Sequence, residues 1–187
     1  MLGIIGAMDE EVEKLKAQMK NVLIEKKAGM EFYRGLLGEK EAVVVRSGIG
    51  KVNAAVCAQI LVDDFSVNAL INTGIAGSLN KDINIGDIVI SSDVAHHDVD
   101  AVAFGYPVGQ IPRMEVLSFA ADQELVSLAK ASCETVNPEV SIFVGRVVSG
   151  DQFVSSKEKK QWIEETFGGL CTEMEGAAIA QTAYLNQ

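Results

Sequence analysis

The sequence has 187 residues, of which 48% are hydrophobic and 22% are charged, and its formal net charge is −10. This length and composition predict one globular domain, residues 1–187, with a substantial core, and they exclude a disordered chain. An acidic chain offers no basic stripe that could neutralise phosphates. Nucleic acid is therefore not an expected partner, and a small molecule is favoured.

Cysteine usage and hydropathy point to an ordinary intracellular environment. Cys57, Cys133 and Cys171 are far apart and form no C-x-x-C pair, so we expect neither a disulfide framework nor a zinc site. No apolar run approaches the length of a membrane span, and the N-terminal segment lacks the basic start of an export signal. We therefore predict a cytoplasmic protein that has no membrane contact.

Apolar runs alternate with helical patterns along the chain, which predicts an α/β fold. Residues 3–8 form an apolar run ended by acids, as in a buried strand that leads into a helix capped by Asp9. Further strands are predicted at 31–37, 42–46, 68–73, 87–91 and 141–148. Helices are predicted at 52–65, 122–135, 157–167 and from Glu175 onward. The short turn at 38–40 suggests a hairpin, so the sheet is expected to be mixed.

Two small-residue turns follow apolar strands. Residues 48–51, Gly-Ile-Gly-Lys, stand between a strand and a helix, where backbone N–H groups can cradle an anion or a sugar hydroxyl. Residues 73–78, Thr-Gly-Ile-Ala-Gly-Ser, end another strand. Tight turns alone would explain these glycines as well as a ligand would. Because open α/β sheets bind ligands beyond their strand ends, the two turns together suggest one crevice.

Acidic side chains stand at two predicted helix starts. Glu10 and Glu11 lie in the first turn of the first helix, where the helix dipole favours any carboxylate. Thr172 and Glu175 have the spacing of a capping box, with Thr172 as the cap and Glu175 as the reciprocal acceptor. From spacing alone, a structural role explains each of these acids better than catalysis does.

The segment 94–117 shows no clear periodicity, and long loops of this kind are often functional. It contains His96, His97, Asp98 and Asp100, but no third, separated group of metal ligands is visible. We therefore predict no metal site, and we expect Asp98 and Asp100 to cap or brace the loop.

Six motifs in one order resemble those of the methylthioadenosine/S-adenosylhomocysteine nucleosidases, nearly from end to end. They are GIIGAMDEEV at 3–12, SGIGKVNAA at 47–55, NTGIAG at 72–77, FGY at 104–106, SGDQF at 149–153 and EME at 173–175. The resemblance implies a single α/β domain of the nucleoside phosphorylase type, with a central twisted mixed β-sheet flanked by helices. It also implies a homodimer.

The same resemblance implies an activity. Family members hydrolyse the N-glycosidic bond of 5'-methylthioadenosine, S-adenosylhomocysteine and 5'-deoxyadenosine, and release adenine in methionine salvage and the activated methyl cycle. Water is the acceptor, and no metal or organic cofactor takes part. Bond cleavage builds positive charge on the ribose and negative charge on the adenine, and it needs an oriented water molecule, so carboxylates suit the reaction.

Roles for individual residues follow from the family pattern. Glu11 would be the base that positions and activates water. Glu175 would accept hydrogen bonds from the ribose hydroxyls, and Met174 would pack on the sugar. Phe153 would stack on adenine, while the backbone of Val154 would bind the edge of the base.

The family pattern also implies an apolar pocket for the 5'-thioalkyl group. Met8 and Ile49 would line it, and the neighbouring subunit would close it with Phe104, Tyr106 and Pro112. Ile75 stands where many family members have serine, which removes a hydroxyl contact near the sugar but suits an apolar crevice. Beyond the last helix, the family pattern continues to an Arg-x-x-Ser-Asp sequence whose aspartate protonates adenine N7. The sequence ends at Gln187, so we expect this strand and helix to be absent and the activity of the chain to suffer.

Two alternatives of different classes stay open. A nucleoside phosphorylase of the same fold would use phosphate in place of water and would need basic residues around an anion site. Arg46 and Arg146 are the only basic residues on the motif-bearing strands. A non-catalytic nucleoside-binding protein is the second alternative, and adenine release from methylthioadenosine separates it from an enzyme.

Overall fold

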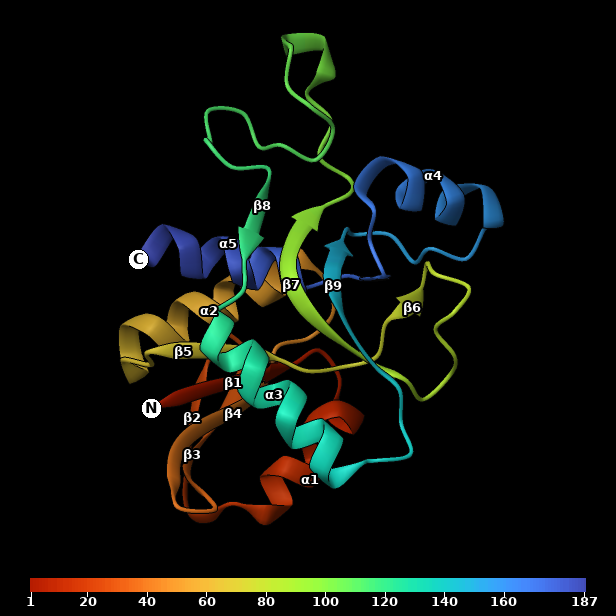
Figure 1. Ribbon diagram of the computed structural model, residues 1–187. Coiled ribbons are helices and arrows are strands. Elements are labelled where there is room, and N and C mark those ends of the chain that lie inside the picture. Colours follow the sequence, from red (N-terminus) through yellow and green to blue (C-terminus); the bar gives the residue numbers. More distant parts are fainter. The chain divides into compact units, whose positions relative to one another are not determined.

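The computed structural model describes residues 1–187, and the chain forms two compact units (Figure 1). Unit 1 comprises residues 1–75 and 181–187, and unit 2 comprises residues 76–180. Each unit contains a five-stranded mixed sheet and helices, which confirms the predicted α/β class. The expectation that residues 1–187 act as one domain stays a prediction. None of the helices has both the length and the apolar content needed to cross a membrane.

The sheet of unit 1 has the strand order β2-β3-β4-β1-β5. Its strands are β1 (Leu2–Gly6), β2 (Lys20–Lys27), β3 (Met30–Leu37), β4 (Lys40–Arg46) and β5 (Ala69–Asn72). Strand β1 runs parallel to both β4 and β5, whereas β3 pairs antiparallel with β2 and β4. The predicted hairpin is thus confirmed as β3–β4. Strand β2 was not predicted, because nearly all of its side chains are exposed and it shows no core-facing pattern.

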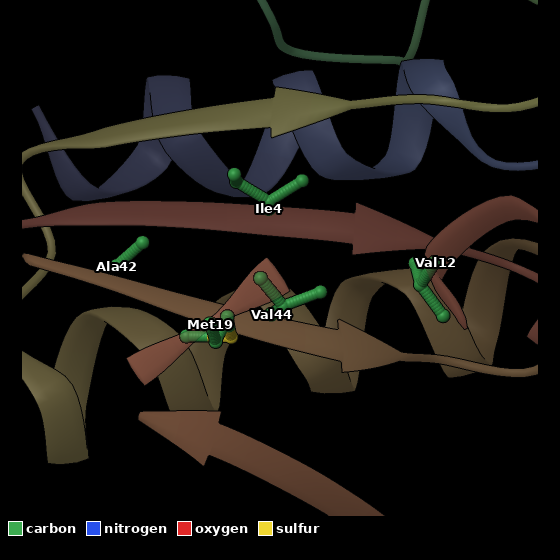
Figure 2. Close-up of a cluster of buried hydrophobic side chains, with 5 residues drawn as sticks. All are labelled: Ile4, Val12, Met19, Ala42 and Val44. Atoms are coloured by element: carbon green, nitrogen blue, oxygen red, sulfur yellow. The ribbon is translucent and has the colours of Figure 1, made fainter. Parts of the chain in front are cut away.

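Helices α1 (Asp9–Gln18) and α2 (Lys51–Phe65) pack on the sheet of unit 1. On one face, side chains of β1, β4 and α1 form a core cluster with Met19, which directly follows α1 (Figure 2): Ile4, Val12, Met19, Ala42 and Val44. The neighbouring position, Gly3, instead faces Leu61 of α2. Successive strand residues point to opposite faces of the sheet, and helices cover both faces. Consecutive positions of the strand must therefore all be apolar. The unbroken Val43-Val44-Val45 run meets this need.

The first turn of α1 differs from the sequence prediction. We predicted a strand to Met8 and a cap at Asp9, but β1 ends at Gly6 and the N-cap is Met8. The reason is the Glu11 side chain, three residues into the helix, which accepts the backbone N–H groups of Ala7 and Met8. Because these N–H groups bind Glu11, they form no hydrogen bonds with a neighbouring strand, and the strand ends before them.

The sheet of unit 2 has the strand order β6-β10-β9-β7-β8. Its strands are β6 (Gly77–Ser78), β7 (Ile88–His96), β8 (Ser118–Ala120), β9 (Ile142–Ser149) and β10 (Cys171–Glu173). The three central strands are parallel, and the two edge strands are antiparallel. Strand β7 continues to His96, so residues 94–96 belong to a strand and not to the long loop. The predicted end at residue 91 reflects a real irregularity, since the β7–β9 register shifts between Ser91 and Val94.

Helices α3 (Gln123–Val136) and α4 (Lys157–Phe167) belong to unit 2, where the side chains of Asp122 and Ser156 cap their N-termini. Helix α4 contributes to a core with β7 and β9, formed by Leu79, Ala95, Val148, Ile163 and Phe167. Helix α5 (Gly176–Asn186) begins in unit 2. Its last residues belong to unit 1, where Asn186 donates a hydrogen bond to Gln59 of α2 at 2.8 Å.

Candidate functional site

Three parallel strands of unit 1 end at the same edge of the sheet. The turns that follow β4, β1 and β5 are joined by backbone hydrogen bonds: Ser47 N donates to Gly6 O, and Thr73 N donates to Ile5 O, both at 2.9 Å. The two small-residue turns of the sequence therefore lie beside the start of α1, as expected for a ligand crevice at the carboxyl ends of strands.

The Glu11 side chain binds backbone N–H groups of two segments at this edge of the sheet. Its Oε2 accepts the N–H groups of Ala7 (2.7 Å) and Met8 (3.0 Å), and its Oε1 accepts the N–H of Ile75 (3.0 Å). A carboxylate offers about four lone-pair directions, so these three bonds fix its orientation and leave one direction for a further donor. A water molecule bound there would be held by a group that can take its proton.

Gly74 makes this arrangement possible. A Cβ atom built on Gly74 would lie 2.4 Å from Glu11 Oε1 and 2.8 Å from its Cδ. Only glycine therefore lets the turn after β5 approach the carboxylate closely enough for Ile75 N to bind it. Conformational freedom is not the reason, because Gly74 does not have a positive φ.

The other turn, Ser47 to Gly50, does require glycine conformations. Gly48 and Gly50 have φ values of 85° and 98°, and Gly50 is the N-cap of α2. Ser47 Oγ donates to Gly48 O at 2.8 Å, and Asn53 Nδ2 donates to Ile49 O at 2.7 Å. These bonds hold the turn so that Ile49 is 54% exposed at its tip.

A hollow of about 330 Å³ lies beside these turns. It is lined by residues of the β1–α1 turn and of the end of β4 with its following turn: Ala7, Met8, Asp9, Glu10, Arg46, Gly48 and Ile49. Met8 and Ile49, which the family pattern assigns to one pocket, thus line one hollow. Ile75 is 77% exposed and is held at the same strand edge through its bond to Glu11.

A second polar network lies in unit 2, at the carboxyl ends of β9 and β10. Glu173 Oε2 accepts the N–H groups of Glu175 (2.9 Å) and Gly176 (2.7 Å), while Ser149 Oγ accepts the N–H of Ala177 (2.7 Å). The Ser149 hydroxyl in turn donates to Glu173 Oε1. Three consecutive N–H groups at the start of α5 are therefore satisfied by two side chains.

This network corrects the predicted capping box. Thr172 is part of β10, and its buried hydroxyl makes no hydrogen bond. Glu173 takes the capping role, although it lies three residues before the first helical residue. Sequence rules place a capping side chain next to the helix, so they missed both Glu173 and Ser149. Glu175 itself is only 7% exposed.

The remaining assigned residues of unit 2 lie on loops or beside this network. Phe153, 88% exposed, and Val154 follow β9 in an irregular segment, where Val154 packs against the core of unit 2. Met174 is partly buried between Glu173 and Glu175. The structure therefore packs Val154 against the core of unit 2, and it presents the Phe153 ring to the outside.

The segment after β7 extends away from the sheet of unit 2 (Figure 1). It contains a single turn of 3₁₀ helix, η1 (Val102–Phe104), at which Phe104 is 83% exposed. The Tyr106 hydroxyl accepts the N–H of Arg113 at 3.2 Å, which joins the two arms of the loop beside the exposed Pro112. The loop therefore presents Phe104 and Pro112 at its surface.

The aspartates of this loop brace it, as predicted. Asp98 Oδ2 accepts the N–H of Asp151 at 2.9 Å, and Asp100 Oδ1 accepts the N–H of Val102 at 3.1 Å. His96 and His97 are both buried at the end of β7. No group of three or more His, Cys, Asp or Glu side chains is arranged to hold a metal ion.

Both arginines that could have formed a phosphate site have carboxylate partners. Arg146 binds Asp93 at 2.6 Å and donates to Phe167 O at 3.0 Å, which ties β9 to the end of α4. Burial raises the pKa of Asp93, but hydrogen bonds from Arg146, Ser118 and Ser92 outweigh burial and lower it overall. Arg46 pairs with Asp9 at 3.2 Å and is the more exposed of the two arginines.

Comparison with known proteins agrees with this fold. A family model described as the phosphorylase superfamily matches residues 1–187. Among curated proteins, the 5'-methylthioadenosine/S-adenosylhomocysteine nucleosidase of Staphylococcus aureus (strain JH9) is 45% identical over 185 residues, which cover 98% of this chain and 80% of that protein. The chain belongs to the 5'-methylthioadenosine/S-adenosylhomocysteine nucleosidases of the phosphorylase superfamily.

Solved structures give the same result. The nucleosidase from Neisseria meningitidis in complex with methylthio-immucillin-A superposes with a TM-score of 0.95 at 42% identity, covering 99% of this chain and 80% of that chain. The nucleosidase from Colwellia psychrerythraea 34H in complex with adenine also has a TM-score of 0.95, at 40% identity, covering 99% of this chain and 76% of that chain. The predicted nucleoside phosphorylase-like fold is confirmed.

Proposed function

We propose that the protein hydrolyses the N-glycosidic bond of 5'-methylthioadenosine, S-adenosylhomocysteine and 5'-deoxyadenosine and releases adenine. Water is the acceptor, without a metal or an organic cofactor. The observation that carries the proposal is the Glu11 carboxylate, which three backbone N–H groups hold at the strand edge with one lone-pair direction left for a donor. The names of the relatives and the adenine in one of their structures support the substrate class.

The chemistry follows from how charge develops. As the bond breaks, the ribose becomes cationic and the adenine anionic, and a water molecule must attack the sugar carbon. Glu11 orients that water and takes its proton. The departing adenine anion takes a proton from solvent, and Glu11 then returns its proton to solvent, which balances the reaction. In unit 2, Glu175 accepts hydrogen bonds from the ribose hydroxyls, with Met174 against the sugar. Phe153 stacks on the adenine, and the Val154 backbone binds its edge.

The apolar end of the substrate has its own residues. Met8 and Ile49 line the hollow of unit 1 and receive the 5'-thioalkyl group, and Ile75 adds apolar surface beside Glu11. Burial of a methylthio group against such side chains contributes about 0.8 kcal/mol per buried methylene-sized group. The reaction therefore favours nucleosides with an apolar 5' substituent over adenosine.

Adenine release from 5'-methylthioadenosine, measured with and without inorganic phosphate, tests the reaction class. We expect release at the same rate in both, with free methylthioribose as the second product, because the proposed acceptor is a water molecule held at Glu11 and not phosphate. A rate that requires phosphate and yields a sugar phosphate would make the protein a phosphorylase. Tight binding without any release would make it a non-catalytic binding protein.

Gly74→Ala is expected to lower turnover by about 10²-fold, the cost of an ångström-scale misplacement of a reacting group. The new methyl group would overlap Glu11 Oε1 and push the carboxylate from its N–H donors. Gly77→Ala is the matched control, since a Cβ there would meet Thr172 Cγ2 at an ordinary 3.7 Å. Steady-state kinetics on both variants checks this, and equal activities would show that Glu11 tolerates displacement.

We also propose that two copies form a homodimer in which each completes the other's site with Phe104, Tyr106 and Pro112. Phe104→Asp should weaken the dimer by at least about a hundredfold, because each of two symmetric copies loses about 1.5–3 kcal/mol of apolar burial. Sedimentation over a concentration series measures this. Ile85→Asp is the control, since it places the same charge at another exposed apolar residue. A compact monomer that still binds methylthioadenosine tightly would contradict the proposal.

In the cell, we place this reaction in the cytoplasm, where it serves methionine salvage and the activated methyl cycle. The support is the names of the relatives, which specify two thioethers of adenosine, one with a methyl group and one with homocysteine. We propose that residues 1–187 act as one nucleosidase domain, because a single family model matches this whole range.

A further inference from the structure

The hollow in unit 1 combines apolar and charged linings. Met8 and Ile49 supply the apolar part, and the Asp9 and Arg46 side chains stand next to them as an ion pair of 3.2 Å. Both charged side chains are well exposed, at 69% for Asp9 and 46% for Arg46. An exposed pair of this kind contributes little to stability, so stability does not explain why it lines a hollow beside Glu11.

The pair can bind a second pair of charges at small cost. Arg46 contacts Asp9 through Nε, and a guanidinium carries five N–H donors in all, so its other N–H groups can bind a carboxylate. The Asp9 carboxylate can likewise accept from an ammonium group. The Asp9–Arg46 pair is exposed to solvent, and it stays partly hydrated when a zwitterion binds beside it. The desolvation cost of binding the zwitterion is therefore small.

We propose that Asp9 and Arg46 form a subsite for the amino-acid tail of S-adenosylhomocysteine, in which Arg46 binds the α-carboxylate and Asp9 binds the α-ammonium. The inference rests on the proposed function, which places the 5' sulfur against Met8 and Ile49. The two substrates differ only beyond that sulfur, where methylthioadenosine carries a methyl group and S-adenosylhomocysteine a zwitterion. Asp9 directly follows Met8 and faces Arg46. The Asp9–Arg46 pair thus raises the affinity for substrates that have a charged tail.

Four nucleosides separate the two charges: methylthioadenosine, S-adenosylhomocysteine, and 5'-thioadenosines with a carboxypropyl or an aminopropyl tail. For Arg46→Met, we expect kcat/KM relative to methylthioadenosine to fall about two- to fivefold for the two carboxylate-bearing substrates, the range of an exposed ion pair. For Asp9→Asn, the same fall should affect the two ammonium-bearing substrates. The change should appear in KM, because the tail is remote from the bond that breaks.

Arg34→Met is the matched control, since it makes the same substitution at another exposed arginine, on β3. In the unmutated protein, raising the ionic strength from about 0.01 M to about 1 M shortens the screening length from about 30 Å to about 3 Å. The ratio of kcat/KM for S-adenosylhomocysteine to kcat/KM for methylthioadenosine should fall as the ionic strength rises. This measurement does not depend on the folding of any variant.

Equal effects of Arg46→Met and Arg34→Met on all four nucleosides, together with a preference that salt does not change, would overturn the subsite while leaving the nucleosidase activity intact. Adenine release from none of the four nucleosides would overturn the proposed function, and the subsite with it. Substrate-selective losses that follow the charge of the tail would support the assignment of each side chain.

Discussion

Glu11→Gln is expected to lower the rate of adenine release by about 10²–10⁴-fold, the usual cost of losing a general base. The amide keeps the shape of the carboxylate but cannot take a proton from water. Affinity for adenine should change only by a modest factor, because in the proposed reaction Glu11 would act on the water and not on the base. Single-turnover kinetics with a separate binding measurement distinguishes the two effects.

The structure adds a cost that shape alone does not predict. Three N–H groups point at the Glu11 oxygens, so one of them must face the NH₂ group of a glutamine. We expect a loss of about 1–2 kcal/mol in the free energy of unfolding, which leaves the protein folded. Glu13→Gln, an exposed site on the same helix with the same charge change, is the control. Turnover of Glu11→Gln close to that of Glu13→Gln would mean that Glu11 only organises the helix start.

Glu173→Ala is expected to lower the free energy of unfolding by about 2–4 kcal/mol, because two N–H groups at the start of α5 lose their acceptor. Affinity for the ribose, which we propose that Glu175 binds, should fall as well, because Glu173 accepts the backbone N–H of Glu175. Glu173→Gln should recover most of both, as one amide oxygen can still accept the two N–H groups. Denaturant unfolding and KM measured on the three proteins check this, and recovery of stability without recovery of KM would separate capping from positioning.

Thr172→Val tests the same assignment from the opposite side. The sequence favours Thr172 as the cap, whereas its buried hydroxyl makes no hydrogen bond in the structure. Replacing an unsatisfied hydroxyl by a methyl group of similar shape should be close to neutral in stability. A loss as large as that of Glu173→Ala would restore Thr172 as the cap and would refute the role of Glu173.

Most of the fold could be predicted because its signals are local. The Val43-Val44-Val45 run, covered on both faces of the sheet, predicts a buried parallel strand, and the helical spacing of apolar positions predicts α1 and α2. Strands β2, β6, β8 and β10 were missed for the opposite reason. Three of them are two or three residues long and the fourth is almost wholly exposed, so backbone pairing with neighbours, and not side-chain pattern, makes them strands.

The sequence by itself determined the α/β class, the two glycine-containing turns and, through six ordered motifs, the family and the residues proposed for its site. Tertiary structure alone decided how those residues are held. Glu11 is fixed by an N–H group 64 residues away, Gly74 is required by the closeness of that contact, and Glu173 binds the start of α5 together with Ser149 of another strand. Sequence rules describe contacts between near neighbours, whereas parallel strands bring distant residues to one edge of a sheet. The distances that give a carboxylate its orientation are set only there.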